Sequence, residues 1–471
     1  MGVIGGRGGS SRDARPEPRQ GGGFAQILRN RNFALLWVGQ TISWFGDSLY
    51  FVALLWLVQE LTGSRAMMGL VAACRTIPTL AGFFAGAFID RWDRRRVMLF
   101  ADLGRAALVV TVPLLATAGW LQPWHIPVVA FALASVGVFF YPARQALVPA
   151  LVGRDGLTTA NSLLTLSQQV IFVVGYAAGG IMIASFGTLS LFTIDAATFV
   201  ISALAIWALR LGVQAARPRT TESSGTTGAH VRTSIADDVR QGFAFIFGHK
   251  MLLYVAPLSV VFNFLFAPIS VLLPSWAKDV LGGGADTFGF LQTATTVGLA
   301  IGSVSVAVAA RRYRRSGLVM GGMLGMSMIV LAMSLVRTIP VAFMVMGALG
   351  VANATVNVLF MTYMQTVVPR ELMGRVFGAL ETVSNVAAPA GQALAGVLGQ
   401  VIALPLVFGG AGGVMVAISL GYLLTPKLRG AFRLMDSDAS EPGLASPVPG
   451  AVAAGSSSAG DPSDPRDPTA A

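Results

Sequence analysis

The amino-acid sequence predicts an all-α membrane protein with about twelve transmembrane helices in two pseudo-symmetric halves of six. Of its 471 residues, 54% are hydrophobic and 12% are charged, and the mean hydropathy is +0.68. No water-soluble domain could keep such a composition exposed. The apolar residues occur in runs of about 20, the length of a helix that spans a bilayer. Short sequence matches also recur at equivalent places in the two halves.

The N-terminal half is preceded by a basic tail. Residues 1–23 are rich in Gly, Arg and Pro and offer too little apolar area to fold, so we expect them to be disordered. Residues 24–212 form the expected N-terminal half. Its six helices are predicted at residues 33–59, 66–90, 97–118, 125–149, 161–185 and 188–210.

A polar segment separates this half from the next one. Residues 213–250 predict a cytoplasmic linker, in which residues 235–247 form a short amphipathic helix whose apolar face suits the membrane surface. Residues 251–428 form the expected C-terminal half, and residues 429–471, rich in Ser, Pro, Gly and Ala, a second disordered tail. The second six helices are predicted at residues 251–277, 287–310, 317–336, 340–366, 376–399 and 403–425.

Two repeats relate the halves. The end of the fourth span, Gln145 to Pro149, matches the end of the tenth, Gln365 to Pro369. A pair of glycines four residues apart occurs in both the second and the eighth span, as Gly82 with Gly86 and as Gly298 with Gly302. Glycines at this spacing let two membrane helices approach closely.

The basic residues predict the orientation. Nearly all the arginines between spans fall on one side of the membrane, whereas Arg65, Lys278 and Arg337 fall on the other. The positive-inside rule then places both termini in the cytoplasm of a multi-pass protein of the cell inner membrane. The net charge of +11 reflects this topology and an attraction to anionic lipid, and it does not indicate nucleic-acid binding.

A compact charge cluster ends the second span. The segment combines a glycine, an acidic residue and three arginines at fixed offsets: Gly86, Asp90, Arg91, Arg94 and Arg95. This pattern resembles the signature of the loop between the second and third helices of the major facilitator superfamily. The usual glycine before the arginine pair is replaced by Asp93, as in the subgroup of macrolide efflux proteins and enterobactin exporters.

The resemblance implies a secondary transporter whose two halves rock about a central site. It also implies that the cluster is a conformational latch, because the family's aspartate, here Asp90, faces the start of the eleventh helix. The fifth span holds Gly175 to Gly180, which is similar to part of the glycine-rich motif of drug:proton antiporters but lacks its proline. A close helix contact through small residues is the alternative reading of that segment.

Intramembrane charges supply the proton-coupling candidates. Asp47 lies on one face of the first span at a depth closed from both bulk phases, and it is preferred over Glu381, which lies near the cytoplasmic end of the eleventh span. Burial of a carboxyl group favours its neutral form, as reversible proton binding requires. Arg75 has a similar predicted depth to Asp47 and is either its partner, a cavity residue or a structural residue that packs with Gly82.

Uncharged polar residues on the spans predict a polar interior, in which each is either a substrate contact or an interhelical hydrogen-bond partner. The candidates for the cavity are Gln40, Ser43, Tyr50, Asn263, Gln292, Asn353, Asn357 and Asn385. Asp195 and the pair Asp102 with Arg105 are expected on helices away from the cavity, and Arg144 is expected near the cytoplasmic helix end.

No pattern for catalysis is present, so we expect neither an enzyme nor a cofactor or metal site. The first hypothesis is proton-coupled efflux of amphipathic small molecules, such as a drug, an antibiotic or a siderophore-like metabolite. The alternatives are proton-coupled nutrient uptake and a non-transporting receptor on the same fold. The expected partners are a small-molecule substrate, the proton and membrane lipid, and we expect a monomer.

Overall fold

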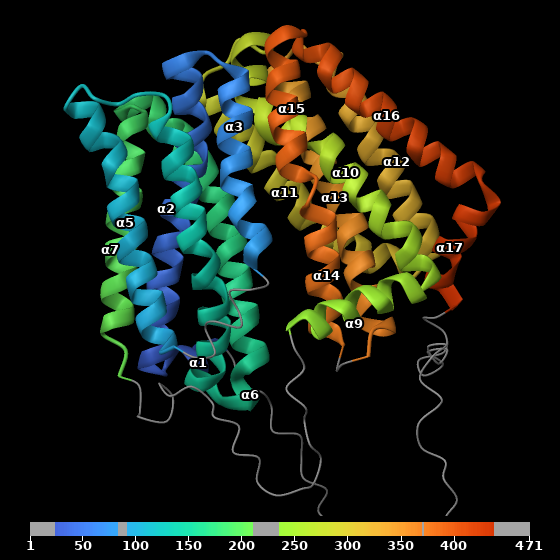
Figure 1. Ribbon diagram of the computed structural model, residues 1–471, viewed down its shortest axis with the longest axis horizontal. Coiled ribbons are helices and arrows are strands. Elements are labelled where there is room, and N and C mark those ends of the chain that lie inside the picture. The colour runs from blue at the N-terminus through green and yellow to red at the C-terminus, as the bar shows by residue number, and fades with distance from the viewer. Residues whose placement is uncertain (1–23, 83–91, 211–234, 370–371, 438–471) are drawn as a thin grey trace, which may run out of the picture. The chain divides into compact units, whose positions relative to one another are not determined.

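The computed structural model describes residues 24–82, 92–210, 235–369 and 372–437, and all their regular structure is helical (Figure 1). Within these residues, ten helices are long and apolar enough to cross a membrane. The prediction of an all-α membrane fold is confirmed, whereas the second and eleventh predicted spans are not among the ten. The predicted latch residues Gly86, Asp90 and Arg91, both terminal tails (1–23 and 438–471) and most of the linker (211–234) lie outside the described residues.

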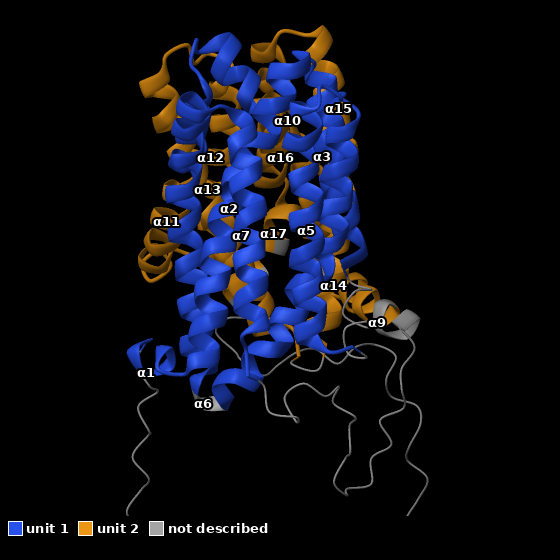
Figure 2. Cartoon of the chain, turned by 90° about the vertical axis from the view of Figure 1, so that its left-hand side faces the viewer, with its two compact units in different colours: residues 1–224, 273–296 blue, residues 225–272, 297–471 orange. Residues whose placement is uncertain are grey.

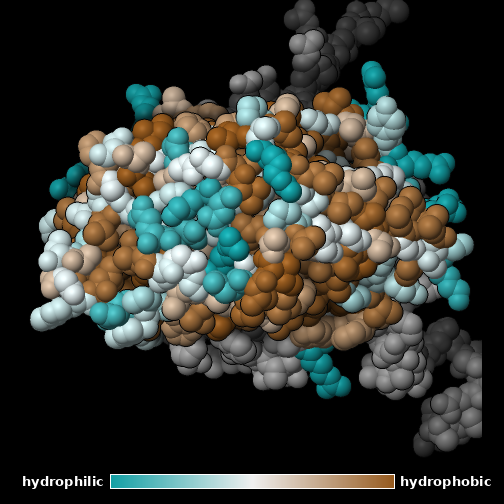
Figure 3. All heavy atoms as spheres, turned by 90° about the horizontal axis from the view of Figure 1, so that it is seen from above, coloured by the Kyte–Doolittle hydropathy of each residue, from teal (hydrophilic) through white to brown (hydrophobic). Residues whose placement is uncertain are grey.

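The chain forms two compact units (Figure 2). Unit 1 comprises residues 1–224 together with residues 273–296, and unit 2 comprises residues 225–272 and 297–471. The second segment of unit 1 belongs, by sequence, to the C-terminal half. The view from above looks onto the ends of the helices, where hydrophilic and hydrophobic residues are interspersed (Figure 3).

Unit 1 is built mainly from the N-terminal half. Its helices are α1 (Phe24–Leu28), α2 (Arg31–Thr62), α3 (Arg65–Thr76), the 3-10 helix η1 (Ile77–Ala81), α5 (Arg94–Thr117), α6 (His125–Phe186) and α7 (Thr188–Trp207). Its second segment holds the end of α10 (Lys250–Ser275), the π-helical η2 (Trp276–Val280) and the first half of α11 (Ala285–Ala309).

Capping residues set the ends of α2. The Asn30 side chain accepts hydrogen bonds from the backbone N–H groups of Asn32 and Phe33, which have no partner within the helix. At the other end, Gly63 takes a left-handed conformation with φ of 60° and donates its N–H to the carbonyl of Gln59. Ser64 then caps α3 by accepting from the N–H of Met67. A tight turn therefore joins the first two spans.

The long helix α6 contains two spans. Gly153 has a φ of 69° inside it, a conformation that side chains disfavour, and the helix is interrupted there. The two spans cover residues 125–153 and 156–186. The fourth span is therefore longer than the predicted 125–149, which matters for the depth of Arg144.

The second predicted span is not one regular helix in its described part. Helix α3 ends at Thr76 and passes into η1, which carries Pro78 in its first turn. A proline lacks the N–H that an α-helix needs there. A Cβ added to Gly82 would lie 3.9 Å from Val138 Cγ1, an ordinary contact distance. Among the described residues, the close helix approach predicted for the glycine pair has no support at Gly82, and Gly86 lies outside these residues.

The segment 273–296 packs closely onto the rest of unit 1. Ser275 Oγ donates to Gln59 Oε1 at 2.8 Å, and Arg65 pairs with Asp279 at 2.7 Å. A Cβ on Gly180 of α6 would meet the carbonyl oxygen of Ala285 at 2.6 Å, so only glycine permits this contact. The segment from Gly175 to Gly180 thus makes a close helix contact, which was the alternative to an antiporter motif.

Unit 2 contains the remaining helices. They are α9 (Ile235–Gly248), most of α10, the second half of α11, α12 (Arg315–Met333), α13 (Ile339–Val367), α14 (Met373–Asn385), α15 (Ala388–Val401), α16 (Leu404–Leu424) and α17 (Pro426–Ser437). The predicted eleventh span is divided between α14 and α15, because Pro389 falls in the first turn of α15. Residues 429–437, predicted as tail, belong to α17.

Two helix contacts shape unit 2. Gly298 and Gly302 of α11 lie directly against the backbone of α13 at Gly347 and Val351, as the predicted glycine pair requires. The amphipathic helix of the linker exists as α9, and its buried Ile246 belongs to an apolar cluster with Val376, Ala379 and Leu380 of α14. Ile246 is therefore covered by protein, and the prediction that the apolar face of α9 lies against the membrane is wrong at this residue, whereas Phe247 is 65% exposed.

Candidate functional site

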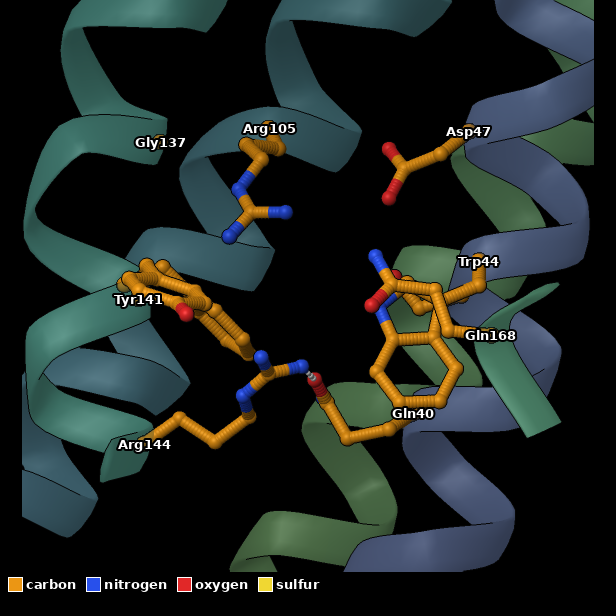
Figure 4. Close-up of a pocket in the computed structure, with 10 residues that line it drawn as sticks. Gln40, Trp44, Asp47, Arg105, Gly137, Tyr141, Arg144 and Gln168 are labelled. Carbon is orange, nitrogen blue, oxygen red and sulfur yellow. Dashed lines mark hydrogen bonds between the residues drawn. The ribbon is translucent and has the colours of Figure 1, made fainter. Parts of the chain in front are cut away.

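A polar cavity of about 170 Å³ lies inside unit 1 (Figure 4). Helices α2, α5 and the two spans of α6 supply its walls. Three charged side chains, two amides and three aromatic rings face it. The lining residues are Gln40, Ser43, Trp44, Asp47, Arg105, Gly137, Phe140, Tyr141, Arg144 and Gln168.

Asp47 is the acidic group of this cavity. It projects from α2, and Figure 4 shows its carboxylate facing Arg105 of α5 across the cavity. Among the described residues, no cation lies within ion-pairing distance of Asp47, and the pairs found are Arg65 with Asp279, Arg96 with Asp93 and Arg105 with Asp102. Asp47 is therefore placed to gain or lose a proton without first breaking a salt bridge.

Arg75 does not pair with Asp47 in this structure. It is exposed, and its guanidinium lies 4.9 Å from the ring centroid of Phe51, within cation–π range. It is not among the residues that line the cavity. Of the three readings of Arg75, the structure gives the ion pair no support.

Arg105 is a cavity residue that sequence reasoning assigned elsewhere. The predicted pair with Asp102 is present, with 3.6 Å between Arg105 Nη2 and Asp102 Oδ1. The prediction that both lie away from the cavity is wrong for Arg105, because α5 packs against α6 and turns this side chain toward α2. Two rings, Phe140 at 4.2 Å and Phe199 at 5.0 Å, flank the guanidinium. Asp102 itself is fully buried.

Arg144 is a second cavity residue that the sequence did not predict. The sequence placed it near the end of the fourth span, but that span continues to Gly153, so Arg144 lies well inside the bundle and is only 9% exposed. Its Nη1 donates to Gln40 Oε1 at 3.3 Å, and its guanidinium lies 5.2 Å from the ring of Trp44 and 5.0 Å from that of Tyr141. Knowledge that the fourth span extends to Gly153 would have predicted the depth of Arg144 inside the bundle.

The predicted polar face of α2 divides into two parts. Gln40 and Ser43 line the cavity with Asp47, and Gln40 also donates to Ser202 Oγ of α7 at 3.4 Å. Tyr50 instead packs edge-on against Phe192 of α7, with ring centroids 5.5 Å apart. It does not line this cavity.

The remaining cavity candidates lie elsewhere. In unit 2, Asn263 donates to the carbonyl of Ser384 at 2.9 Å, and Asn357 donates to Asn353 Oδ1 at 2.9 Å. Both contacts are the interhelical or local amide bonds that were the alternative to substrate binding. Glu381 is exposed on α14, and Asn385 and Gln292 are partly buried at the end of α14 and in α11.

The two described arginines of the predicted latch bind main-chain carbonyls of neighbouring helices. Arg94 Nη1 donates to the carbonyl of Ala146 at 3.3 Å. Arg95 Nε donates to the carbonyl of Ile206 at 3.0 Å and its Nη2 to that of Trp207. Ile206 and Trp207 are the last two residues of α7, so Arg95 caps this end and offsets its partial negative charge.

Comparison with known proteins identifies relatives of this chain. A family model described as "transmembrane secretion effector" matches residues 22–451. The multidrug efflux pump Tap of Mycolicibacterium fortuitum is 29% identical over 393 residues, covering 82% of this chain and 93% of that protein. Macrolide efflux protein A of Streptococcus pyogenes is 22% identical, covering 77% and 88% respectively.

Solved structures show the same fold. A mutant of the nucleoside transporter NupG superimposes with a TM-score of 0.67 at 12% identity, covering 86% of this chain and 99% of that one. A bacterial homologue of the lysosomal transporter Spinster, inward-facing and unoccupied, gives a TM-score of 0.63 at 14% identity, covering 87% and 98%. At these identities the likeness concerns the fold alone.

Proposed function

Because the chain belongs to the transmembrane secretion effector family of the major facilitator superfamily, we propose that it exports amphipathic small molecules by alternating access, driven by protons that enter the cell. The efflux pumps among its relatives support the direction of transport. The observation that carries the proposal is the polar, aromatic-lined cavity of unit 1 with Asp47 in its wall. We propose a monomer in the cell inner membrane with both termini cytoplasmic.

In this proposal Asp47 couples the proton to the substrate. An antiporter needs a group that holds either a proton or the substrate, but not both. A cavity carboxyl without a fixed salt bridge meets this requirement, because its ionised form attracts donors and cations while its protonated form does not. The guanidinium groups of Arg105 and Arg144 in the same cavity would stabilise the ionised form after the proton has left and before the substrate binds.

The proposed export is tested by dye accumulation. In an efflux-deficient host, cells that express the protein should accumulate several times less of a fluorescent cationic amphiphile than cells with an empty vector. A protonophore should remove this difference, because it abolishes the driving force. Greater accumulation with the protein than without it would favour uptake instead, and equal accumulation by both strains would favour a receptor.

We further infer that the basic loop after the second span is a conformational latch. The inference rests on the family pattern at Asp90 and on the main-chain contacts of Arg94 and Arg95. In the superfamily this aspartate faces the start of the eleventh helix, which in this chain is the first turn of α14. A carboxylate at a partly buried helix N-terminus contributes about 1–2 kcal/mol, enough to bias two states severalfold.

Asp90→Asn should therefore lower the transport rate severalfold while expression and substrate affinity stay nearly unchanged. The amide keeps the size of the side chain and removes only its charge. Transport rates in proteoliposomes and dye binding to purified protein measure the two quantities separately. A wild-type transport rate in this variant would eliminate the latch assignment.

A further inference from the structure

Arg144 is a buried cation that faces a cavity and has only neutral partners. Its guanidinium contacts the Gln40 amide and the rings of Trp44 and Tyr141, and no carboxylate lies within 4.0 Å of it in the part of the chain that the structure describes. Arg105 differs, because Asp102 lies 3.6 Å from it. A buried charge is costly unless it is paired, and the cavity is where a partner for Arg144 can enter.

The charges around the cavity indicate what that partner carries. Asp47, Arg105 and Arg144 line the cavity. Asp102 pairs with Arg105 but does not itself line the cavity. Asp195 of α7 is fully buried, accepts from Thr198 Oγ1 and does not line the cavity. With Asp47 and Asp102 ionised and Asp195 protonated, the two carboxylates and two guanidiniums cancel. An occupant without net charge keeps this balance, and one that also supplies Arg144 with an anionic partner must carry a cationic group as well.

The walls and the volume restrict the occupant further. Trp44, Phe140 and Tyr141 offer ring surfaces beside Arg144. Drug-sized molecules need pockets of about 300–1,000 Å³, whereas this cavity has about 170 Å³. It therefore holds one end of a larger molecule, a ring with its charged substituents.

We propose that the cavity is a subsite for zwitterionic aromatic amphiphiles, in which Arg144 binds the substrate's carboxylate while its cationic group is balanced by ionised Asp47. A guanidinium suits this role because its planar fork donates two parallel hydrogen bonds to a carboxylate. A proton on Asp47 leaves the cluster with an excess positive charge and repels the cationic group, so release and proton uptake are linked. The subsite rests on the proposed export function and names its substrate class.

A pair of dyes tests the subsite. A rhodamine with a free carboxylate is zwitterionic, and its methyl ester has the same rings but only the positive charge. Binding of each dye to purified full-length protein is measured by fluorescence polarisation, and export is measured in proteoliposomes. Arg144→Gln should weaken binding of the carboxylate dye about tenfold or more, the loss expected for a charge-assisted contact, and change binding of the ester less than about twofold.

Two further variants complete the test. Arg144→Lys keeps the charge without the fork and should give an intermediate loss for the carboxylate dye. Arg312→Gln makes the same chemical change at an exposed arginine and should leave both affinities at the wild-type value. The melting temperature of each variant is measured alongside, so that a loss of fold is recognised as such.

Equal weakening of both dyes by Arg144→Gln would overturn the proposal, because Arg144 would then serve Asp47 or the fold instead of the carboxylate. Export of the ester with no binding of the carboxylate dye by the wild type would also overturn it and leave the export function intact. Conversely, Arg144-dependent binding of the carboxylate dye without export of either dye would keep the subsite and refute the export function.

Discussion

Asp47→Asn is expected to abolish concentrative export while downhill exchange of substrate continues. The amide keeps the shape of the side chain in the cavity wall but can neither release nor take up a proton, so the pH gradient no longer performs work on the substrate. Exchange only requires that the two accessible states interconvert with substrate bound, and it does not require a change in protonation. We therefore expect uphill transport at the level of empty liposomes and exchange within severalfold of the wild type.

Proteoliposomes with an imposed pH gradient measure both activities in one preparation. Glu381→Gln makes the same chemical change at the exposed carboxylate of α14 and should retain uphill export. Arg75→Ala should reduce uphill export less than Asp47→Asn does, because no ion pair joins Arg75 to Asp47. If Asp47→Asn still exports against a gradient, Asp47 is not the coupling group and Glu381 becomes the candidate.

The second large effect concerns stability. Arg105→Gln should lower the free energy of unfolding by about 3–5 kcal/mol, the cost of leaving a buried ion without its partner. Asp102 is fully buried and its ion pair with Arg105 lies between α5 and the rings of Phe140 and Phe199. Removal of the guanidinium leaves the carboxylate without a counter-charge and takes two ring contacts from the bundle.

The double variant Arg105→Gln with Asp102→Asn separates charge from packing. Because it removes both charges, it should recover most of the lost stability, measured as unfolding in mixed micelles or as the melting temperature in detergent. Arg96→Gln, which breaks an exposed pair with Asp93 at 3.9 Å, is the matched control and should cost less than about 1 kcal/mol. A single variant as stable as the wild type, or a double variant no better than the single one, would contradict this account.

The positions of most helices could be predicted from the sequence because lipid imposes one strong rule, a long apolar run for each span. The two spans that depart from single helices both carry prolines, Pro78 and Pro389, whose effect on a helix depends on its neighbours. The end of the fourth span was placed too early, because its apolar run stops before the helix does at Gly153.

The cavity was only half predictable. Gln40, Ser43 and Asp47 could be recognised because they share one face of one helix. Arg105 and Arg144 lie on other helices, and which way their faces turn depends on how α5 and α6 pack against α2. That rotation is a tertiary property, and a single sequence contains no signal for it beyond the cost of burying a charge.

The segment 273–296 limits which parts of the chain can be exchanged between related proteins. It is encoded after the central linker, yet it folds with the first unit through Ser275, Asp279 and Ala285. A chimera made by exchanging halves at the linker would bring in a foreign copy of these residues to meet native Gln59, Arg65 and Gly180. Unit 1 is therefore encoded by two separate stretches of the gene. A recombinant that transfers residues 273–296 together with the first half should yield more folded protein than one joined at the linker alone.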